Sequence, residues 1–135
     1  MIGVLIVTHG AVGEALLASA AQILGGPPQQ VATLGVSRND DPDVVLPRAK
    51  ELIAQLDRGA GVLVLADMFG ATPCNIAARL LVDGRVEGVA GLSLPMLVRV
   101  LAGRNGSLAA AVERARSGGA EGVVYMNGDR CNGAR

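Results

Sequence analysis

The stretch Ile2-Gly3-Val4-Leu5-Ile6-Val7-Thr8-His9-Gly10 decides the fold of this chain. Its first six residues are apolar or glycine, which is typical of a strand buried on both faces of a parallel sheet. Thr8 and His9 then stand beyond the carboxyl end of that strand, where open α/β sheets bind their ligands. His9 is the single histidine of the chain, and an imidazole can take up a proton or a phosphoryl group near neutral pH. A hydrogen-bonded structural histidine is the alternative.

The composition favours one domain that acts on a small ligand or a protein partner. The 135 residues suit one domain, and 12 basic residues balance 12 acidic ones. That balance excludes a basic surface for nucleic acid or for an anionic membrane. One Phe, one Tyr and no Trp disfavour a stacking platform for bases or sugar rings. Cys74 and Cys131 form no CxxC motif, so we expect reduced thiols and no metal site.

No targeting leader opens the sequence, and no apolar stretch approaches the roughly 20 residues that span a bilayer. We therefore expect a cytoplasmic protein without direct membrane insertion.

Short apolar runs recur along the chain and alternate with helix-like segments. The predicted strands cover residues 2–7, 31–36, 61–66, 86–92 and 122–125. This alternation predicts an α/β fold, a doubly wound and mostly parallel sheet with helices on both faces. Residues 1–125 would form this domain. Residues 126–135 are polar and glycine-rich, which predicts a disordered tail.

The helix ends carry recognisable signals. The first predicted helix covers residues 13–24 and ends before Gly25-Gly26, and the second begins at Asp41-Pro42. The third is capped by Thr72 and ends at Asp83-Gly84. The last two cover residues 94–101, capped by Ser93, and residues 108–116, between Ser107 and Gly118-Gly119. Pro47 lies inside the second of these and lacks the amide that a helix needs there. Either that helix bends at Pro47 or it begins one turn later.

A second polar segment follows the third strand. Asp67 comes directly after the apolar run that ends at Ala66. Because strands one and three are plausible neighbours in a right-handed parallel layout, we expect His9 and Asp67 to lie side by side. The carboxylate would accept the proton of one ring nitrogen and leave the other free as a nucleophile. A solvated carboxylate or a helix cap is the alternative for Asp67.

The loop after Asp67 could hold an anion. Gly70, Ala71 and Thr72 stand at the amino end of the third helix, where backbone N–H groups and the helix dipole attract negative charge. An ordinary capped helix start is the alternative, and the loop lacks the lysine of a nucleotide-binding P-loop.

Three segments together resemble the IIA component of the mannose-family sugar phosphotransferase system. They are GVLIVTHG at residues 3–10, DMFGATPCN at residues 67–75 and LPML at residues 94–97. The resemblance implies a phosphotransferase without a cofactor, in which His9 accepts a phosphoryl group from phospho-HPr through Nε2 and Asp67 orients the ring. The acceptor would be a IIB component or a regulatory target, and the resemblance leaves sugar uptake and regulation both open.

The resemblance also assigns secondary roles. Thr72 occupies a phosphate-facing position, so we predict phosphate contacts from Thr8, Gly70, Ala71 and Thr72. The predicted contacts with partner proteins are Met68, Phe69, Leu94 and Met96, although each of these apolar residues suits the core equally well. Family members look like homodimers that exchange the last strand, which here would be the antiparallel strand at residues 122–125.

Two other functions remain open from the sequence. A phosphotransferase subunit that feeds dihydroxyacetone kinase has a similar fold and an early histidine, but its loop after strand three differs. A receiver-like signalling module would use Asp67 as acceptor and needs a lysine near its last strand, whereas Lys50 is the only lysine here.

Overall fold

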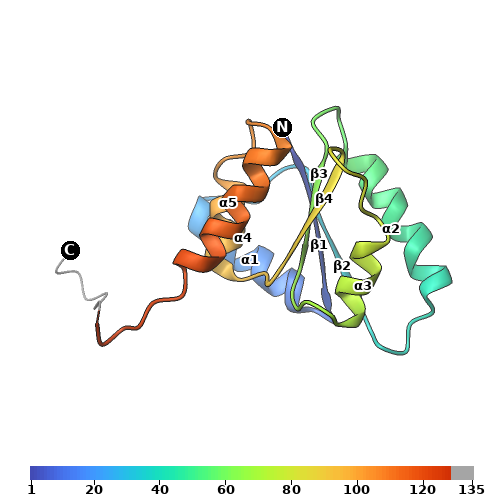
Figure 1. Ribbon diagram of the computed structural model, residues 1–135, viewed down its shortest axis with the longest axis horizontal. Coiled ribbons are helices and arrows are strands. Elements are labelled where there is room, and N and C mark those ends of the chain that lie inside the picture. Colours follow the sequence, from blue (N-terminus) through green and yellow to red (C-terminus); the bar gives the residue numbers. More distant parts are fainter. Residues whose placement is uncertain (129–135) are drawn as a thin grey trace.

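The computed structural model describes residues 1–128 and shows one parallel sheet between two layers of helices (Figure 1). The elements in chain order are β1 Gly3–His9, α1 Val12–Leu24, β2 Val31–Val36, α2 Pro42–Leu56, β3 Val62–Ala66, α3 Thr72–Ala78, β4 Val86–Ala90, α4 Leu94–Leu101 and α5 Leu108–Glu121. The strand order is β2-β1-β3-β4, and every neighbouring pair is parallel. The predicted α/β class is confirmed.

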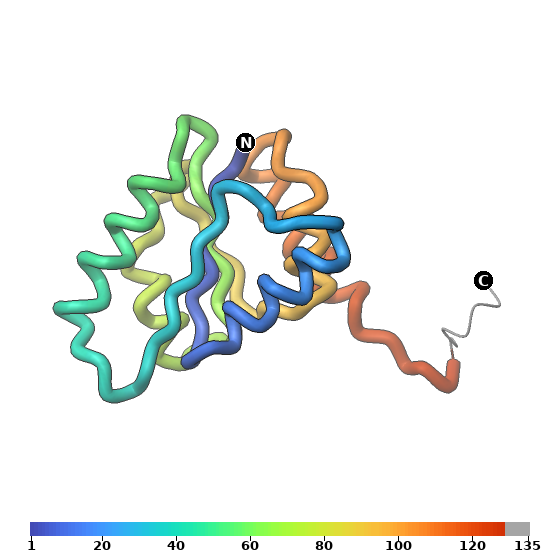
Figure 2. The backbone as a smooth tube through the Cα atoms, turned by 180° about the vertical axis from the view of Figure 1, so that it is seen from behind, coloured from blue at the N-terminus to red at the C-terminus, as the bar shows by residue number. Residues whose placement is uncertain are grey.

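The helices cover the two faces of the sheet unequally. α1, α4 and α5 pack on one face, around a core that includes Ile6, Leu65 and Leu97. α2 and α3 pack on the other face, around a core that includes Leu5 and Val64. Figure 2, from behind, shows the same two layers on either side of the strands. The alternate residues of β1 thus point into two separate cores, which is why the run has no polar position before Thr8.

β1 lies between β2 and β3, and its register fixes the location of the candidate site. His9 is opposite Val36 of β2, and Val7 is opposite Ala66 of β3. The residues that follow these strands therefore meet at one edge of the sheet. Asp67, the next residue after β3, is placed beside His9 by this register.

Most predicted helix starts are confirmed. Asp41 accepts a hydrogen bond from the Asp43 amide at 2.9 Å, and Ser93 accepts one from the Met96 amide at 3.3 Å. α2 begins at Pro42 and continues through Pro47, so it does not start one turn later. The predicted cap of α3 is wrong, because Ala71 is the capping residue and no side chain caps this helix. α3 also ends at Ala78 instead of reaching Asp83.

The predicted end of α5 is wrong, and helix packing explains the error. α5 continues through Gly118-Gly119 to Glu121. A Cβ atom on Gly118 would lie 3.1 Å from the Arg99 Cβ and 3.2 Å from the Met96 Cα of α4. This glycine allows two helices to approach closely and does not end one of them. An ion pair between Arg99 and Glu121 joins the same helices.

The segment predicted as a fifth strand is not paired in the single chain. Val123, Val124 and Tyr125 follow α5 without a strand assignment and extend away from the body (Figure 1). Of the tail predicted at residues 126–135, residues 129–135 lie outside the described part of the chain. Across residues 1–128, none of the helices combines the length and the apolar character needed to cross a membrane.

Candidate active site at the carboxyl end of the sheet

His9 and Asp67 meet where β1 and β3 end. The His9 Nδ1 atom lies 2.8 Å from the Asp67 Oδ2 atom, and the backbone N–H of His9 donates to the same oxygen at 3.0 Å. Asp67 therefore holds both the main chain and the ring of His9. The backbone contact carries no signal in the sequence, because any residue type except proline would supply that donor at position 9.

The environment of Asp67 favours its ionised form. Burial of the Asp67 side chain raises the pKa of its carboxyl, but the hydrogen bonds from the His9 backbone and ring lower the pKa further, and the net pKa is below the usual value. The carboxylate is thus charged at neutral pH. Its second oxygen, Oδ1, is buried and has no hydrogen-bond partner within residues 1–128.

This contact determines which ring nitrogen of His9 is available. An ionised carboxylate accepts hydrogen bonds only, so Nδ1 must carry the proton that it donates to Asp67. In the neutral ring the lone pair is then on Nε2. The His9 side chain is 47% exposed, and a group from another protein can reach it. The arrangement is a nucleophilic imidazole with an oriented ring.

Thr8 supports the turn that carries His9. Its side chain is 1% exposed, and its Oγ1 atom accepts a hydrogen bond from the Gly13 amide at 2.8 Å. A Cβ atom on Gly13 would lie 2.8 Å from the Ile6 side chain, so the first turn of α1 packs directly on β1. This placement favours a structural role for Thr8 over the phosphate contact predicted from the sequence. The sequence shows a glycine at position 13 but does not predict that it packs against β1.

The loop from β3 to α3 borders the site. Gly70 is exposed and has a φ of 82°, in the left-handed region that glycine tolerates, and Ala71 and Thr72 are half-buried. The first amides of a helix lack partners within the helix and can donate to an anion. The three predicted phosphate contacts of this loop are thus accessible from the surface.

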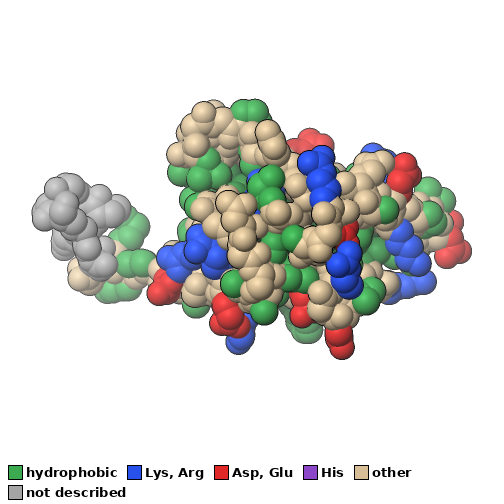
Figure 3. Space-filling model, turned by 90° about the horizontal axis from the view of Figure 1, so that it is seen from above, with side chains coloured by type: hydrophobic (Ala, Val, Ile, Leu, Met, Phe, Trp, Pro, Cys, Tyr) green, Lys and Arg blue, Asp and Glu red, His purple; other side chains and the backbone are tan. Residues whose placement is uncertain are grey.

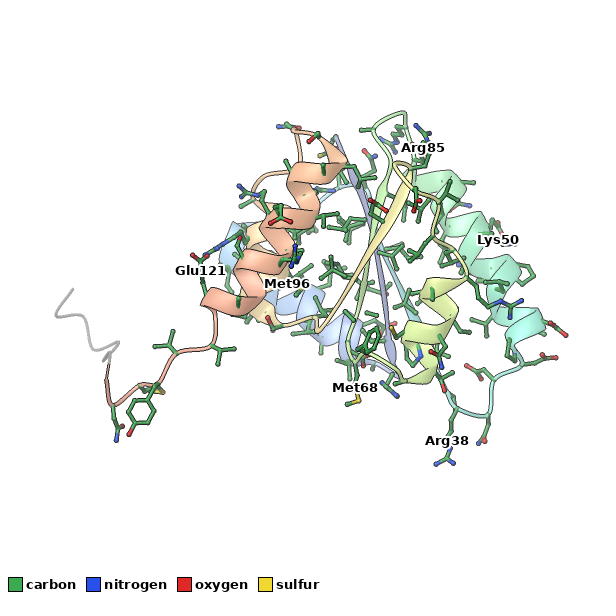
Figure 4. The ribbon with its side chains drawn as sticks, in the orientation of Figure 1. Arg38, Lys50, Met68, Arg85, Met96 and Glu121 are labelled. Carbon is green, nitrogen blue, oxygen red and sulfur yellow. The ribbon has the colours of Figure 1, made fainter. Side chains whose placement is uncertain are left out.

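The four predicted partner contacts separate into two groups. Met68 and Phe69 are 60% and 84% exposed, and Met68 projects outward from the carboxyl edge of the sheet (Figure 4). Leu94 is half-buried against the core. Met96 is 3% exposed and lies within the helix layer of α4 and α5. Met96 is therefore a core residue, and its assignment to a docking surface is corrected.

In residues 1–128, no three side chains of the metal-binding types His, Cys, Asp and Glu come together to form a metal site. Cys74 is a free, half-buried thiol on α3.

Comparison with known proteins decides the family. Residues 3–115 match the EIIA-man family model, described as "PTS system fructose IIA component". The chain belongs to this family of phosphotransferase-system EIIA components. It is 34% identical over 124 residues to the mannose-specific EIIAB component of Escherichia coli K12, a match that covers 87% of this chain and 38% of that protein. The chain thus spans well under half the length of that relative.

A shorter relative is matched over more of its length. The fructose-specific EIIA component of Bacillus subtilis is 31% identical over 102 residues, which is 75% of this chain and 69% of that protein. Among solved structures, an EIIA component from Streptococcus agalactiae superposes with a TM-score of 0.82 at 23% identity, over 95% of this chain and 99% of that chain. A mannose/sorbose IIA subunit from Enterococcus faecalis superposes with a TM-score of 0.80 at 23% identity, over 92% of this chain and 93% of that chain. These structures share the fold.

Family membership places this EIIA component in the mannose family of the sugar phosphotransferase system, whose components transfer phosphoryl groups. The reported matches are to phosphotransferase components, which favours that prediction over the receiver-like alternative.

Proposed function

We propose that His9 accepts a phosphoryl group from phospho-HPr on Nε2 and passes it to a IIB partner, with Asp67 as the residue that orients the ring. The 2.8 Å contact between His9 Nδ1 and Asp67 Oδ2 carries this proposal. In the neutral ring it leaves Nε2 without a proton, on a half-exposed side chain that the contact holds in one orientation.

The transfer needs positioning and charge stabilisation more than covalent assistance. Nε2 forms a bond to phosphorus as the bond from phosphorus to the donor histidine breaks, and the leaving imidazole keeps that electron pair. The His9 ring becomes positively charged when it is phosphorylated, and the Asp67 carboxylate stabilises that charge through Nδ1–H. The amides of Gly70, Ala71 and Thr72 are the proposed donors to the phosphoryl oxygens.

Incubation with phosphoenolpyruvate, enzyme I and HPr tests the function. Intact mass should show one added phosphoryl group, and the label should be labile in acid, as a phosphohistidine is. His9→Ala should remove the label completely. Because His9 is the only histidine of the chain, label retained in His9→Ala, or an acid-stable label, would refute the proposal.

Met68 and Phe69 form the proposed contact with HPr and with the IIB partner. Both side chains are exposed on the loop that begins with Asp67, and exposed Met and aromatic residues are enriched in protein interfaces. Phe69→Ala should raise the KM for phospho-HPr about tenfold, because a large apolar contact is lost. Val44→Ala, at a 69% exposed valine on α2, is the matched control and should leave the KM unchanged.

We also propose a homodimer in which residues 122–125 of one copy add to β4 of the other. β4 is an edge strand, and a groove of about 700 Å³ between its carboxyl end and α4 and α5 is lined by residues such as Val89, Pro95 and Ser117, and also by Gly122 and Val123 of the same chain. Val123 and Tyr125 are 85% and 77% exposed in the single chain. Figure 3 shows hydrophobic side chains on the extension that leaves the body. An open strand edge and an unpaired apolar segment fit each other.

Light scattering tests the dimer. The chain should elute with twice its mass of 13.6 kDa. Val123→Asp should give the monomer mass, whereas Val44→Asp on α2 should not. A monomeric unmodified chain would contradict this part of the proposal.

A further inference from the structure

We propose that Gly35 of β2 positions His9, because the absence of a side chain at residue 35 lets the Gly10 carbonyl pack against the end of β2. The effect of Gly35 on the transfer rate rests on the function proposed above. The effect on the geometry of the ring does not.

The contact between the two glycines is unusually close. A Cβ atom on Gly35 would lie 2.3 Å from the Gly10 carbonyl oxygen and 3.1 Å from the Gly10 carbonyl carbon. Both atoms belong to the backbone, so no side-chain rotation can relieve the clash. The Gly10 amide also donates a hydrogen bond to the carbonyl of Val36, the residue that follows Gly35, at 3.2 Å. The end of β2 therefore holds Gly10 by one hydrogen bond and by direct contact.

Apart from the close approach of Gly10, no contact in residues 1–128 explains why position 35 is a glycine. Gly35 is exposed, and its neighbours Leu34 and Val36 both carry side chains that pack on the α2 side of the sheet. Glycine inside a strand weakens the strand, and its presence often marks a close approach of another backbone. Here that backbone is the residue that follows His9.

A displacement of Gly10 would reach His9 directly. Only Gly10 and Ala11 connect β1 to α1, and α1 is anchored behind them by the hydrogen bond from Gly13 to Thr8. β2 is held along its length by the register from Val4↔Val31 to His9↔Val36. The short exposed turn is thus the part that yields. To reach an ordinary contact distance, Gly10 would have to move by about 1 Å.

A shift of that size disturbs the two bonds that orient the ring. The His9 amide and the Nδ1 atom both bond to one oxygen of Asp67, at 3.0 and 2.8 Å. Movement of the His9 backbone changes both distances together, and a misplacement of about 1 Å can cost roughly a hundredfold in rate.

The test compares Gly35→Ala with Gly3→Ala. A Cβ atom on Gly3 would lie 2.5 Å from the Leu56 carbonyl oxygen, which is an equally severe clash at the opposite end of β1. We measure the ¹⁵N chemical shifts of the His9 ring, the melting temperature and the rate of labelling by phospho-HPr for both variants.

Both variants should melt at lower temperature than the unmodified chain. Only Gly35→Ala should move the ring ¹⁵N signals toward a mixture of tautomers and slow labelling by roughly tenfold to a hundredfold. Ring signals of Gly35→Ala that match those of the unmodified chain, or equal changes in the two variants, would overturn the proposal.

Hydrogen exchange of the unmodified chain provides a measurement that does not depend on a variant. The Gly10 amide should be protected by its bond to Val36, and exchange at the rate of an open loop would overturn the proposal. The ring signals and this exchange rate do not involve phosphate, so a failure of the transfer proposal would leave them unaffected.

Discussion

The two ends of the sheet each contain a half-buried aspartate, and the hydrogen bonds of the two side chains differ. At the amino end, Asp57 Oδ1 accepts hydrogen bonds from Gly59 and Gly61 at 2.9 and 3.2 Å, and Oδ2 pairs with Arg85 at 2.5 Å. At the carboxyl end, Asp67 uses one oxygen, and both of its bonds come from His9. Asp57 closes a loop with hydrogen bonds to both of its oxygens, whereas the two hydrogen bonds of Asp67 share one oxygen and come from one residue.

The ends also differ in what joins the strands. At the amino end, the buried Arg104 donates to the carbonyls of Ile2 and Gln30, at 3.2 and 3.3 Å, and ties the starts of β1 and β2 together. Figure 4 places Arg85 at this end and Met68 at the other. At the carboxyl end the backbone of Gly10 makes the connection. A side chain thus joins β1 to β2 at the amino end, whereas at the carboxyl end the backbone joins these two strands and the Asp67 side chain bonds to His9.

The largest effect is expected for Asp67→Asn. An Asn side chain can turn its NH₂ group toward the ring, which favours protonation of Nε2 and removes the nucleophile. Phosphoryl acceptance should slow by roughly a hundredfold, while stability changes by less than about 1 kcal/mol. Rapid-quench labelling by phospho-HPr measures the rate. An unchanged rate would remove the orienting role from Asp67.

Asp57→Asn should lower the stability of the fold without slowing phosphoryl transfer. It weakens the pair with Arg85 and the bonds that close the loop before β3, so we expect a loss of about 1–2 kcal/mol in the free energy of unfolding. The labelling rate should not change. Urea denaturation gives the free energy, and Glu51→Gln is the control, because Glu51 lies 4.0 Å from Arg48 in an exposed pair. A slower transfer in Asp57→Asn would break the division of roles between the two ends.

Thr8→Val separates two interpretations of Thr8. Loss of the hydroxyl leaves the buried Gly13 amide without its acceptor, which should cost about 1–2 kcal/mol in stability. Transfer at saturating phospho-HPr should slow less than tenfold. A loss of rate far beyond this, at unchanged stability, would instead support the direct phosphate contact predicted from the sequence.

The smallest effect concerns pH. Backbone hydrogen bonds from Gly59, opposed by burial, hold the pKa of Asp57 below its usual value, and hydrogen bonds from His9 outweigh burial to lower the pKa of Asp67. A lowered pKa in the folded state contributes stability that is present above the usual carboxyl range and is lost as pH falls through the lowered pKa.

Thermal unfolding followed from neutral pH into the acid range should therefore show a falling melting temperature below the usual carboxyl pKa. The fall should be shallower in Asp57→Asn and in Asp67→Asn than in the unmodified chain. A fall in each variant as large as that of the unmodified chain would show that other carboxyl groups cause it.

The sequence predicted those features that depend on local signals. The apolar run before Thr8 located β1, the Asp41-Pro42 and Ser93 signals located two helix starts, and the alternation of elements gave the fold class. The proximity of His9 and Asp67 followed from the expected order of strands one and three, which β1 and β3 confirm.

The errors come from contacts between distant segments. The pair Gly118-Gly119 is typical of a helix end, but here it lies inside α5 and allows α4 to pack closely against it. The family resemblance placed Met96 on a docking surface, yet Met96 is buried and packs against Gly118 and Gly119 of α5. Gly35 gave only a general signal, because a glycine in a strand can mark a close approach of another backbone but does not reveal which backbone lies against it.

The site of phosphorylation on the His9 ring tests the account most directly. The chain is labelled with ¹⁵N on histidine, phosphorylated by phospho-HPr and examined for coupling between ³¹P and the two ring nitrogens. We expect coupling that places phosphorus on Nε2, with a proton retained on Nδ1. Phosphorus on Nδ1 would mean that Asp67 does not hold that nitrogen during transfer, and this result would contradict the account.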